Sequence, residues 1–548
     1  MAEIAAEPGR PGGRPLSHDD STSGLHRGLG RTGLLFAGVG SIIGSGWLFG
    51  ALEASQIAGP AAIFSWIIGG VMIMLIGLVY AELGTMFPVS GGVVRFPQFA
   101  FGGFASYTMG WITWLAAASV APVEVEGCLQ YASNNIGGLA HTSAASGGNP
   151  VLTFPLGYVL AVLLMAVFVC INFVGIRAFQ RANTPIVWWK LGVITLVIVA
   201  FLVTRFHGGN LSNYGGFTPY GWHGVFESIA TAGITFSYLG FRQGVELAGE
   251  TDNPSRNVPF AVIGSVALCG LIYVLLQLAF LGAAPSDQLG KGWANLSFAN
   301  DFGPLAGIAQ IIGLSWLATV LYVDAVISPG DTGLIYTTVT ARISYAMARN
   351  RNAPPQLART SARGAPVVSL VLAFVVGLIF FLPFPGWQKL VSFITSATVL
   401  SFGSGPLAWA ALRRQLPDQE RPFRLPGGHV IPFLAFFSAN MIVYWAGWDT
   451  NYKLFLAIVL GFVLLAIGRV VAKDDFPAMH WRAGAWVLPW LAALALISYL
   501  GTYGDGAQDI FGLGVGALLM LVVSVTVYVA AATRLQLPAA EAQEMARS

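Results

Sequence analysis

A few ionisable residues lie inside apolar stretches of this sequence, where water cannot solvate a charge. Lys190, in NTPIVWWKLGVITLV, is the only lysine in such a place. Glu124, Arg242, Asp324 and Asp331 occupy similar stretches. A charge at the centre of a membrane costs at least ~2.5 kcal/mol and marks function by default. Burial penalises the charged form of an amine, so a lysine there can exchange a proton near neutral pH. Lys190 either does this or snorkels, since it is near one end of its stretch.

The acidic residues divide by helical geometry. Asp324 and Asp331, in YVDAVISPGDTG, are seven residues apart and share one helix face with Ser328 and Thr332. Asp324 alternatively caps a helix break introduced by the following SPG. Two further carboxylates, in SVAPVEVEGCLQY, are only two residues apart and point about 200° from each other. We therefore expect one of Glu124 and Glu126 to face an internal path and the other to face the outer surface.

Arg242 has two candidate ion-pair partners. Its guanidinium offers a rigid fork that matches a carboxylate group, such as one on a small acidic ligand. Glu246 lies one helical turn further along and can pair with it instead. The sequence leaves both interpretations open.

The elements that position these residues are membrane spans. The chain has 548 residues, of which 55% are hydrophobic and only 10% are charged, against about 25% charged in ordinary soluble domains. Apolar runs long enough to cross a ~30 Å hydrocarbon core recur along the chain. We expect about fourteen spans, near residues 33–56, 61–86, 104–131, 153–175, 184–204, 222–247, 259–284, 308–346, 366–384, 388–412, 429–448, 452–471, 484–503 and 510–532.

The placement of charge predicts the orientation. Arginines and lysines gather in alternate loops, whereas the opposite loops hold only Arg205, Lys291, Lys389 and Lys453. Cationic loops stay on the cytoplasmic side, so both termini are expected there. The first ~30 residues and the final LPAAEAQEMARS are expected to be disordered tails. The net charge of +3 indicates no nucleic-acid partner, and the three cysteines fall within spans, so they imply no disulfide framework.

Two spans are interrupted at mid-depth. GVGSIIGSGW, residues 38–47, packs four glycines and two serines into the first span, and TFSYLGF, residues 235–241, interrupts the sixth. Paired discontinuous spans at matching places in two halves indicate a binding site. An unwound helix exposes backbone groups that a polar ligand can satisfy, and the start of the second half-helix suits a carboxylate. The alternative is that these small residues serve close helix packing.

Four motifs in order resemble the amino acid–polyamine–organocation transporters over nearly the whole chain. They are GVGSIIGSGWLFG, YAELGTMFPVSGGVVRFPQFAFG, FSYLGFRQGVELAGETDNPSRNVP and ARISYAMARNRNAPPQLARTSARGAP. Within this superfamily, FSWIIGGVMIMLIGLVYAELG, GLSWLATVLYVDAVISPG and LPFPGWQKLV resemble bacterial aspartate–proton symporter-like permeases.

The resemblance implies an all-α five-plus-five inverted-repeat (LeuT-like) core that works by alternating access on an ion gradient. It implies a tail at 1–32, a ten-span core at 33–413, four additional helices at 429–533 and a cytoplasmic tail at 534–548. Lys190 resembles the fifth-span lysine that replaces sodium in proton-coupled members. In this fold the face carrying Asp324 and Asp331 adjoins the first span, so either carboxylate is expected to pair with Lys190 or to relay protons.

These observations predict a multi-pass bacterial cell-membrane transporter that moves an amino acid, an acidic one first, together with protons. Alternatives are a neutral or cationic substrate, an exchanger, or a sensor that binds without transport. No metal-ligand spacing, nucleophile–base set or phosphate-binding loop appears, so we expect no enzyme activity, no metal and no cofactor. Proton coupling is expected from Lys190, Glu124, Asp324 and Asp331. Substrate contacts are expected from Ile42, Ile43, Gly44, Ser45, Gly46, Trp114, Phe236, Ser237, Tyr238, Leu239 and Arg242. The backbone N–H groups of Ser45 and Gly46 are expected to bind the carboxylate of the amino acid. Backbone carbonyls near Ile42, Ile43 and 236–239 are expected to bind its ammonium group.

Overall fold

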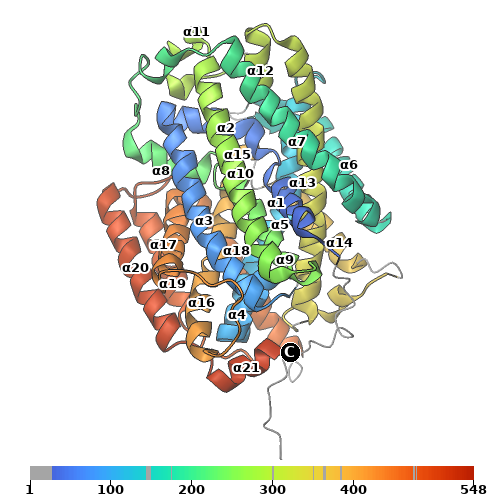
Figure 1. Ribbon diagram of the computed structural model, residues 1–548, viewed down its shortest axis with the longest axis vertical. Helices are drawn as coiled ribbons and strands as arrows, with labels where there is room; N and C mark the ends of the chain where they lie inside the picture. The colour runs from blue at the N-terminus through green and yellow to red at the C-terminus, as the bar shows by residue number, and fades with distance from the viewer. Residues whose placement is uncertain are drawn as a thin grey trace, which may run out of the picture.

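The computed structural model describes residues 28–89, 91–142, 150–174, 176–298, 302–349, 351–361, 366–382, 386–472, 476 and 478–547. The chain is almost entirely helical (Figure 1). One antiparallel hairpin, β1 (Ala140–Thr142) and β2 (Pro150–Leu152), follows the third apolar segment. Most of the expected N-terminal tail lies outside the described residues.

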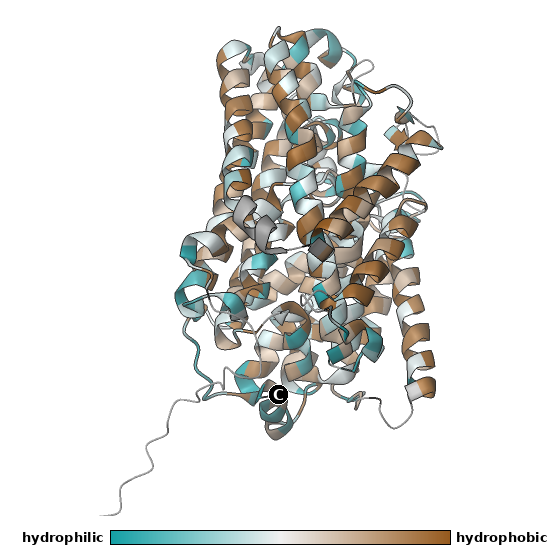
Figure 2. Cartoon of the chain, turned by 90° about the vertical axis from the view of Figure 1, so that its right-hand side faces the viewer, coloured by the Kyte–Doolittle hydropathy of each residue, from teal (hydrophilic) through white to brown (hydrophobic). Residues whose placement is uncertain are grey.

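Eight helical stretches of the described chain are long and apolar enough to cross a membrane by length and composition. Figure 2 shows largely hydrophobic helices, with hydrophilic residues gathered mainly toward the two ends of the bundle. The eight stretches lie within α2 (Gly46–Ala58) with η1 (Gly59–Ala61) and α3 (Ala62–Met86), α5 (Gly103–Ala132), α6 (Leu156–Val174), α7 (Ile176–Thr204), α10 (Pro254–Ala283), α15 (Trp387–Phe402) with α16 (Ser404–Gln415), α18 (Trp448–Ala472) and α20 (Leu513–Thr533).

Further helices complete the bundle. Three short ones, α14 (Val367–Phe380), α17 (Val430–Trp445) and α19 (Val487–Leu500), are apolar. Each of the fourteen segments expected to cross the membrane contains a helix. The remaining α-helices are α1 (Arg31–Ile42), α4 (Gly92–Phe101), α8 (Gly221–Thr231), α9 (Gln243–Glu246), α11 (Ser286–Leu289), α12 (Pro304–Ile311), α13 (Ser315–Arg349) and α21 (Ala539–Arg547). Short 3₁₀ turns are η3 (Gly208–Leu211), η4 (Phe236–Arg242), η5 (Ala248–Glu250), η6 (Trp293–Asn295) and η7 (Pro355–Ala358).

Both predicted helix breaks are present. The first apolar segment is divided into α1 and α2, with residues 43–45 outside either helix. In the sixth segment α8 ends at Thr231, and the 3₁₀ turn η4 separates it from α9. The breaks lie against each other, because a Cβ on Gly240 would collide with the backbone of Ser41 and Ile42. Glycine at position 240 therefore permits a close backbone approach between the two interrupted helices.

Three expectations about element ends were wrong. The eighth span does not begin at 308, because α12 ends at Ile311 and α13 begins only at Ser315. The SPG sequence does not break α13, which continues past Pro329, so Asp324 caps no break. The C-terminal segment is not wholly disordered, since Ala539–Arg547 form α21, which contacts α4 and α16 and buries Ala542.

Helices α17, α19 and α20 pack on one flank of the bundle. In Figure 1 α17, α19 and α20 lie side by side next to α3 and α16, and the contacts between these elements agree. Buried amides hold them together. Asn440 donates to Ser524 Oγ at 2.8 Å and accepts from Trp490 at 3.0 Å. Asn451 donates to the Val443 carbonyl at 2.6 Å.

Candidate functional site

The carbonyl end of α1 is capped by the ammonium group of Lys190. Lys190 Nζ donates to the Gly40 carbonyl at 2.9 Å and lies 2.6 Å from Asp331 Oδ2. The lysine side chain is 0% exposed, so the snorkelling interpretation is wrong. The last carbonyls of a helix lack intrahelical partners and carry partial negative charge, which a cation satisfies. Lys190 therefore ties α7 and α13 to the broken end of α1.

Hydroxyl groups donate hydrogen bonds to the carbonyls at this end of α1. Thr332 Oγ1, one residue after Asp331, donates at 3.3 Å to the Gly40 and Ile43 carbonyls. Tyr273 on α10 donates to the Ile42 carbonyl at 3.2 Å. The carbonyls of Ile42 and Ile43, expected to hold an ammonium group, thus already have donors from the protein. Tyr273 was missed by the sequence analysis, because nothing in its apolar helix marks it.

The opposite side of the break binds a carboxylate of the protein itself. The Ser45 N–H group, at the start of α2, donates to Glu124 Oε2 at 2.7 Å. Both residues are 0% exposed. A backbone donor at this place was expected to bind the carboxylate of a substrate. The structure instead brings Glu124 from α5 to it, and Glu124 is the member of the glutamate pair that faces the break.

Trp387 is a second residue that the sequence analysis did not select. Its indole Nε1 donates to Ser45 Oγ at 2.7 Å, and its ring contacts Phe49 and Phe236 with centroids 4.7 and 6.3 Å away. It begins α15 and connects that helix to both breaks. Its position after Gly386 in LPFPGWQKLV carried no chemical signal beyond the family resemblance.

Asp324 has a separate environment. Its Oδ1 accepts from Trp189 Nε1 at 2.9 Å and from Ser328 Oγ at 2.8 Å. The side chain is 0% exposed. Of the two carboxylates on this face of α13, Asp331 forms the ion pair with Lys190 and Asp324 does not.

Arg242 pairs with its own helical neighbour. Its Nε lies 3.0 Å from Glu246 Oε1, and the arginine side chain is 1% exposed. The guanidinium also lies over the ring of Tyr336, 5.3 Å from its centroid. Of the two interpretations left open, the pairing with Glu246 is the one present.

The other expected contacts divide between the break and more distant places. Phe236 and Ser237 pack against Gly46, where a Cβ would collide with the Ser237 hydroxyl. Tyr238 donates to the Trp66 carbonyl at 3.2 Å, and Leu239 is buried. Trp114 donates to Ser344 Oγ at 2.6 Å, so its polar atom is directed toward α13. No contact described for Trp114 joins it to the break.

Glu126 is buried under the hairpin instead of facing the outer surface. It contacts the backbone of Gly386 and lines a small cavity with Gln130, Trp387 and residues of β2. Its side chain therefore lies on the other side of α5 from Glu124, as the spacing predicted.

The break is closed to solvent in this structure. Residues 38–51 are all buried, and a Cβ on Gly44 would lie only 2.5 Å from Glu124 Oε1. Ser45, Glu124 and Lys190 are all fully buried. A ligand can therefore enter only after the surrounding helices move apart.

Contacts at the N-terminal end of α1, away from the break, help to keep the surrounding helices together. Leu29 bridges to Thr251, and the Thr251 hydroxyl donates to the Leu29 carbonyl at 2.6 Å. Arg342 Nη1 lies 3.0 Å from Glu250 Oε1. These contacts fasten the segment before α1 to the exit of the sixth span and to α13.

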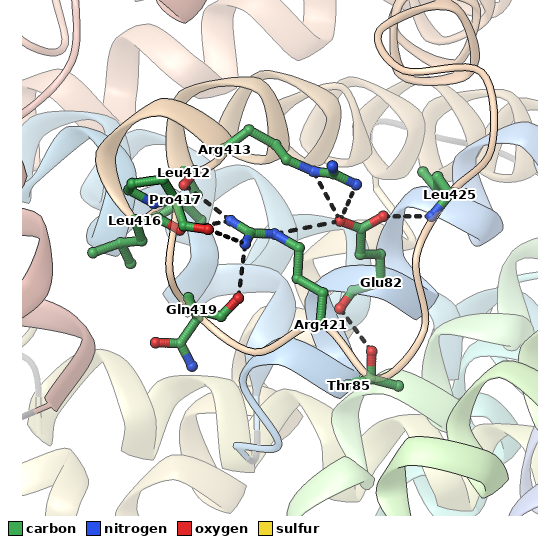
Figure 3. A network of polar contacts seen from close by, with 9 residues as sticks. All are labelled: Glu82, Thr85, Leu412, Arg413, Leu416, Pro417, Gln419, Arg421 and Leu425. Carbon is green, nitrogen blue, oxygen red and sulfur yellow. Dashed lines mark hydrogen bonds and ion pairs between the residues drawn. The ribbon is translucent and has the colours of Figure 1, made fainter. Parts of the chain in front are cut away.

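A second polar network lies at the end of α3 (Figure 3). The buried carboxylate of Glu82 accepts two hydrogen bonds from Arg413, at 2.7 and 3.1 Å, and one from the Leu425 N–H at 2.7 Å. Arg421 lies 3.8 Å from the same carboxylate and donates to carbonyls at the end of α16, including Leu416 at 2.7 Å. Glu82 thus fastens the loop after α16 to α3.

Comparison with known proteins identifies the family. A family model described as amino acid permease matches residues 29–465. The glutamate/serine transporter AimA of Bacillus subtilis is 38% identical over 506 residues, covering 92% of this chain and 93% of that protein. The aspartate-proton symporter of the same organism is 35% identical over 499 residues, covering 90% and 94%. Family and relatives are transporters and not enzymes. The chain belongs to the amino acid permease family, within the amino acid–polyamine–organocation superfamily, and is a multi-pass transporter of the bacterial cell membrane.

Proposed function

We propose that this protein couples the entry of protons to the uptake of an amino acid, with aspartate or glutamate as the first candidates. The observation that carries the proposal is the position of Lys190. A fully buried ammonium group supplies the cation at the carbonyl end of a broken helix, and among the described residues Asp331 is the one carboxylate in ion-pair contact with it. An amine can release its proton, whereas a bound metal ion would have to dissociate as a whole.

The contacts of Lys190 explain how protonation would control the helices. Charged Lys190 attracts both the Gly40 carbonyl and Asp331. Loss of the proton removes the charge from both interactions, and a buried Asp331 then has no cation beside it. The attachment of the broken end of α1 to α7 and α13 is weakened as a result, while the Thr332 hydroxyl still donates to the Gly40 and Ile43 carbonyls. Alternating access would follow from this change in attachment.

The proposal includes the arrangement expected from the sequence. The ten-span core at 33–413 would form two inverted five-span repeats, with α1–α2 and α8–η4–α9 as corresponding broken spans. The helices of 429–533 would add four spans, about fourteen in total. Both termini, with the tails at 1–32 and 534–548, would lie in the cytoplasm. The arginines of the Glu82 network support this orientation because cationic loops stay inside.

The substrate would bind between the two breaks once the site opens. Its carboxylate would take the N–H groups of Ser45 and Gly46, and its ammonium would take carbonyls near Ile42, Ile43 and 236–239. Acidic substrates are supported by the two relatives, a glutamate/serine transporter and an aspartate-proton symporter. The second candidate is a neutral amino acid, and its support is that Arg242 already pairs with Glu246 and is not free for a side-chain carboxylate.

Uptake into proteoliposomes tests the proposal. The purified protein would be supplied with labelled aspartate, glutamate or serine under an inward proton gradient, and in parallel under an inward sodium gradient. Accumulation of at least one of them under the proton gradient alone is expected. Uptake that requires sodium, or exchange that ignores both gradients, would contradict it. Competition by all twenty amino acids then assigns the substrate.

A further inference from the structure

The Ser45 N–H group at the start of α2 donates a hydrogen bond to the carboxylate of Glu124. We propose that Glu124 occupies the place of the substrate carboxylate and is displaced when substrate binds. Substrate would bind only when Glu124 leaves Ser45 and takes up a proton. This inference rests on the proposed function, because it assigns the regulation of the same site.

The geometry matches what a bound carboxylate needs. Ser45 N–H donates to Glu124 Oε2 at 2.7 Å, and no other side chain of the described residues caps α2. Anions are favoured at a helix start because its N–H groups lack partners there. Gly44 leaves the space for the second oxygen, since a Cβ on it would lie 2.5 Å from Glu124 Oε1. A free amino acid entering with its carboxylate at Ser45 would meet Glu124 in the same volume.

Glu124 lacks a cation of its own. The titratable groups that face it from other elements are Lys190 on α7, Asp331 and Tyr336 on α13 and Tyr273 on α10. Cys128, one turn along α5, also lies close enough to interact with Glu124. Lys190 already pairs with Asp331. Displacement from Ser45 would therefore leave Glu124 as a buried charge without a hydrogen-bond donor.

A buried unpaired carboxylate is neutralised by a proton more easily than it is kept charged. The proton would come from the medium, through the opened site, and would form an O–H bond on the Glu124 carboxylate. No other bond changes. One proton would thus accompany each carboxylate ligand that binds, and the affinity for carboxylate ligands would rise as pH falls. An amine that lacks a carboxylate would not displace Glu124 in this way.

The test measures binding of labelled aspartate, glutamate and serine to the purified full-length protein between pH 5.5 and 8. For wild type we expect the Kd of a bound amino acid to rise with pH, approaching tenfold per pH unit where one proton is linked. Glu124→Gln keeps an oxygen that accepts from Ser45 but carries no charge. Its Kd is expected to change less than twofold across the range and to be lower than that of wild type at pH 8.

Glu126→Gln is the matched control, because Glu126 lies on the same helix and contacts Gly386. It should retain the wild-type slope. Glu124→Ala, which also removes the competitor, provides a second test if the glutamine variant fails to fold. An unchanged slope in a folded Glu124 variant would overturn the inference while proton-driven uptake stayed intact. Absence of binding by any amino acid would overturn the inference and the proposed function together.

Discussion

Lys190 Nζ and Asp331 Oδ2 lie 2.6 Å apart, with exposed side-chain fractions of 0% and 1%. The ammonium simultaneously donates to the Gly40 carbonyl of the broken first span. A buried ion pair gains little net stability over an apolar pair, but loss of one partner leaves an uncompensated charge. We therefore propose that this ion pair acts as a switch and does not serve stability alone.

Replacement of Asp331 by asparagine tests that role. The change leaves Lys190 without its counter-charge, so we expect a loss of about 3–5 kcal/mol of stability unless the lysine becomes neutral. Proton-driven uptake should fall by more than tenfold, measured in proteoliposomes. Asp324→Asn is the matched control on the same face, since Asp324 contacts Trp189 and Ser328 instead of Lys190. An equal loss of uptake in both variants would contradict a specific role for Asp331.

Trp387 is expected to position Ser45. Trp387→Phe keeps an aromatic ring against Phe49 and Phe236 but removes the hydrogen bond to Ser45 Oγ. Loss of one buried hydrogen bond of about 1 kcal/mol should raise the KM of uptake about fivefold with a smaller effect on the maximal rate. Kinetics of initial uptake measure this. An unchanged KM would show that the Trp387 hydrogen bond does not contribute to substrate binding.

The Glu82 network should stabilise the protein without taking part in coupling. Glu82→Gln leaves Arg413 without its counter-charge and weakens the acceptor of the Leu425 N–H. Hydrogen bonds to charged groups contribute about 1.5–3 kcal/mol each, so the melting temperature should fall. A thermal unfolding assay in detergent measures it. The proton dependence of the remaining uptake should match wild type, and a shifted pH profile would show that Glu82 takes part in coupling.

Asn451 connects the C-terminal helices to the core. Its amide donates to Ser498 at 2.9 Å on α19, and its oxygen accepts from Ser396 on α15 at 2.5 Å. Asn451→Ala removes both bonds and the one to Val443, on the order of 2 kcal/mol for three membrane-buried bonds. Because α15 carries Trp387, the KM of uptake should rise too. Asn440→Ala is the control. In the described part of the chain its amide joins α17, α19 and α20 alone, so stability should fall with KM unchanged. A KM that rises equally in both variants would contradict the connection.

Sequence patterns predicted both helix breaks, because glycine and serine in an apolar run are visible without a structure. The 200° separation of Glu124 and Glu126 also followed from helical geometry. The hydrogen-bond and ion-pair partners of these residues could not be predicted from the sequence, because they depend on which helices pack together. Ser45 meets Glu124 across 79 positions and Trp387 across 342. Arg242 and Asp324 had local alternatives of similar strength, and only the folded packing decides between them.

The direct test of the central claim is proton entry on addition of substrate. A pH indicator inside proteoliposomes would follow acidification when the amino acid identified by uptake is added outside, with Lys190→Ala beside wild type. We predict substrate-dependent acidification by wild type and a much smaller one by Lys190→Ala, in which only the proton on Glu124 would accompany the substrate, although that variant should still exchange labelled substrate. Equal acidification by the two proteins would show that Lys190 does not carry the coupled proton.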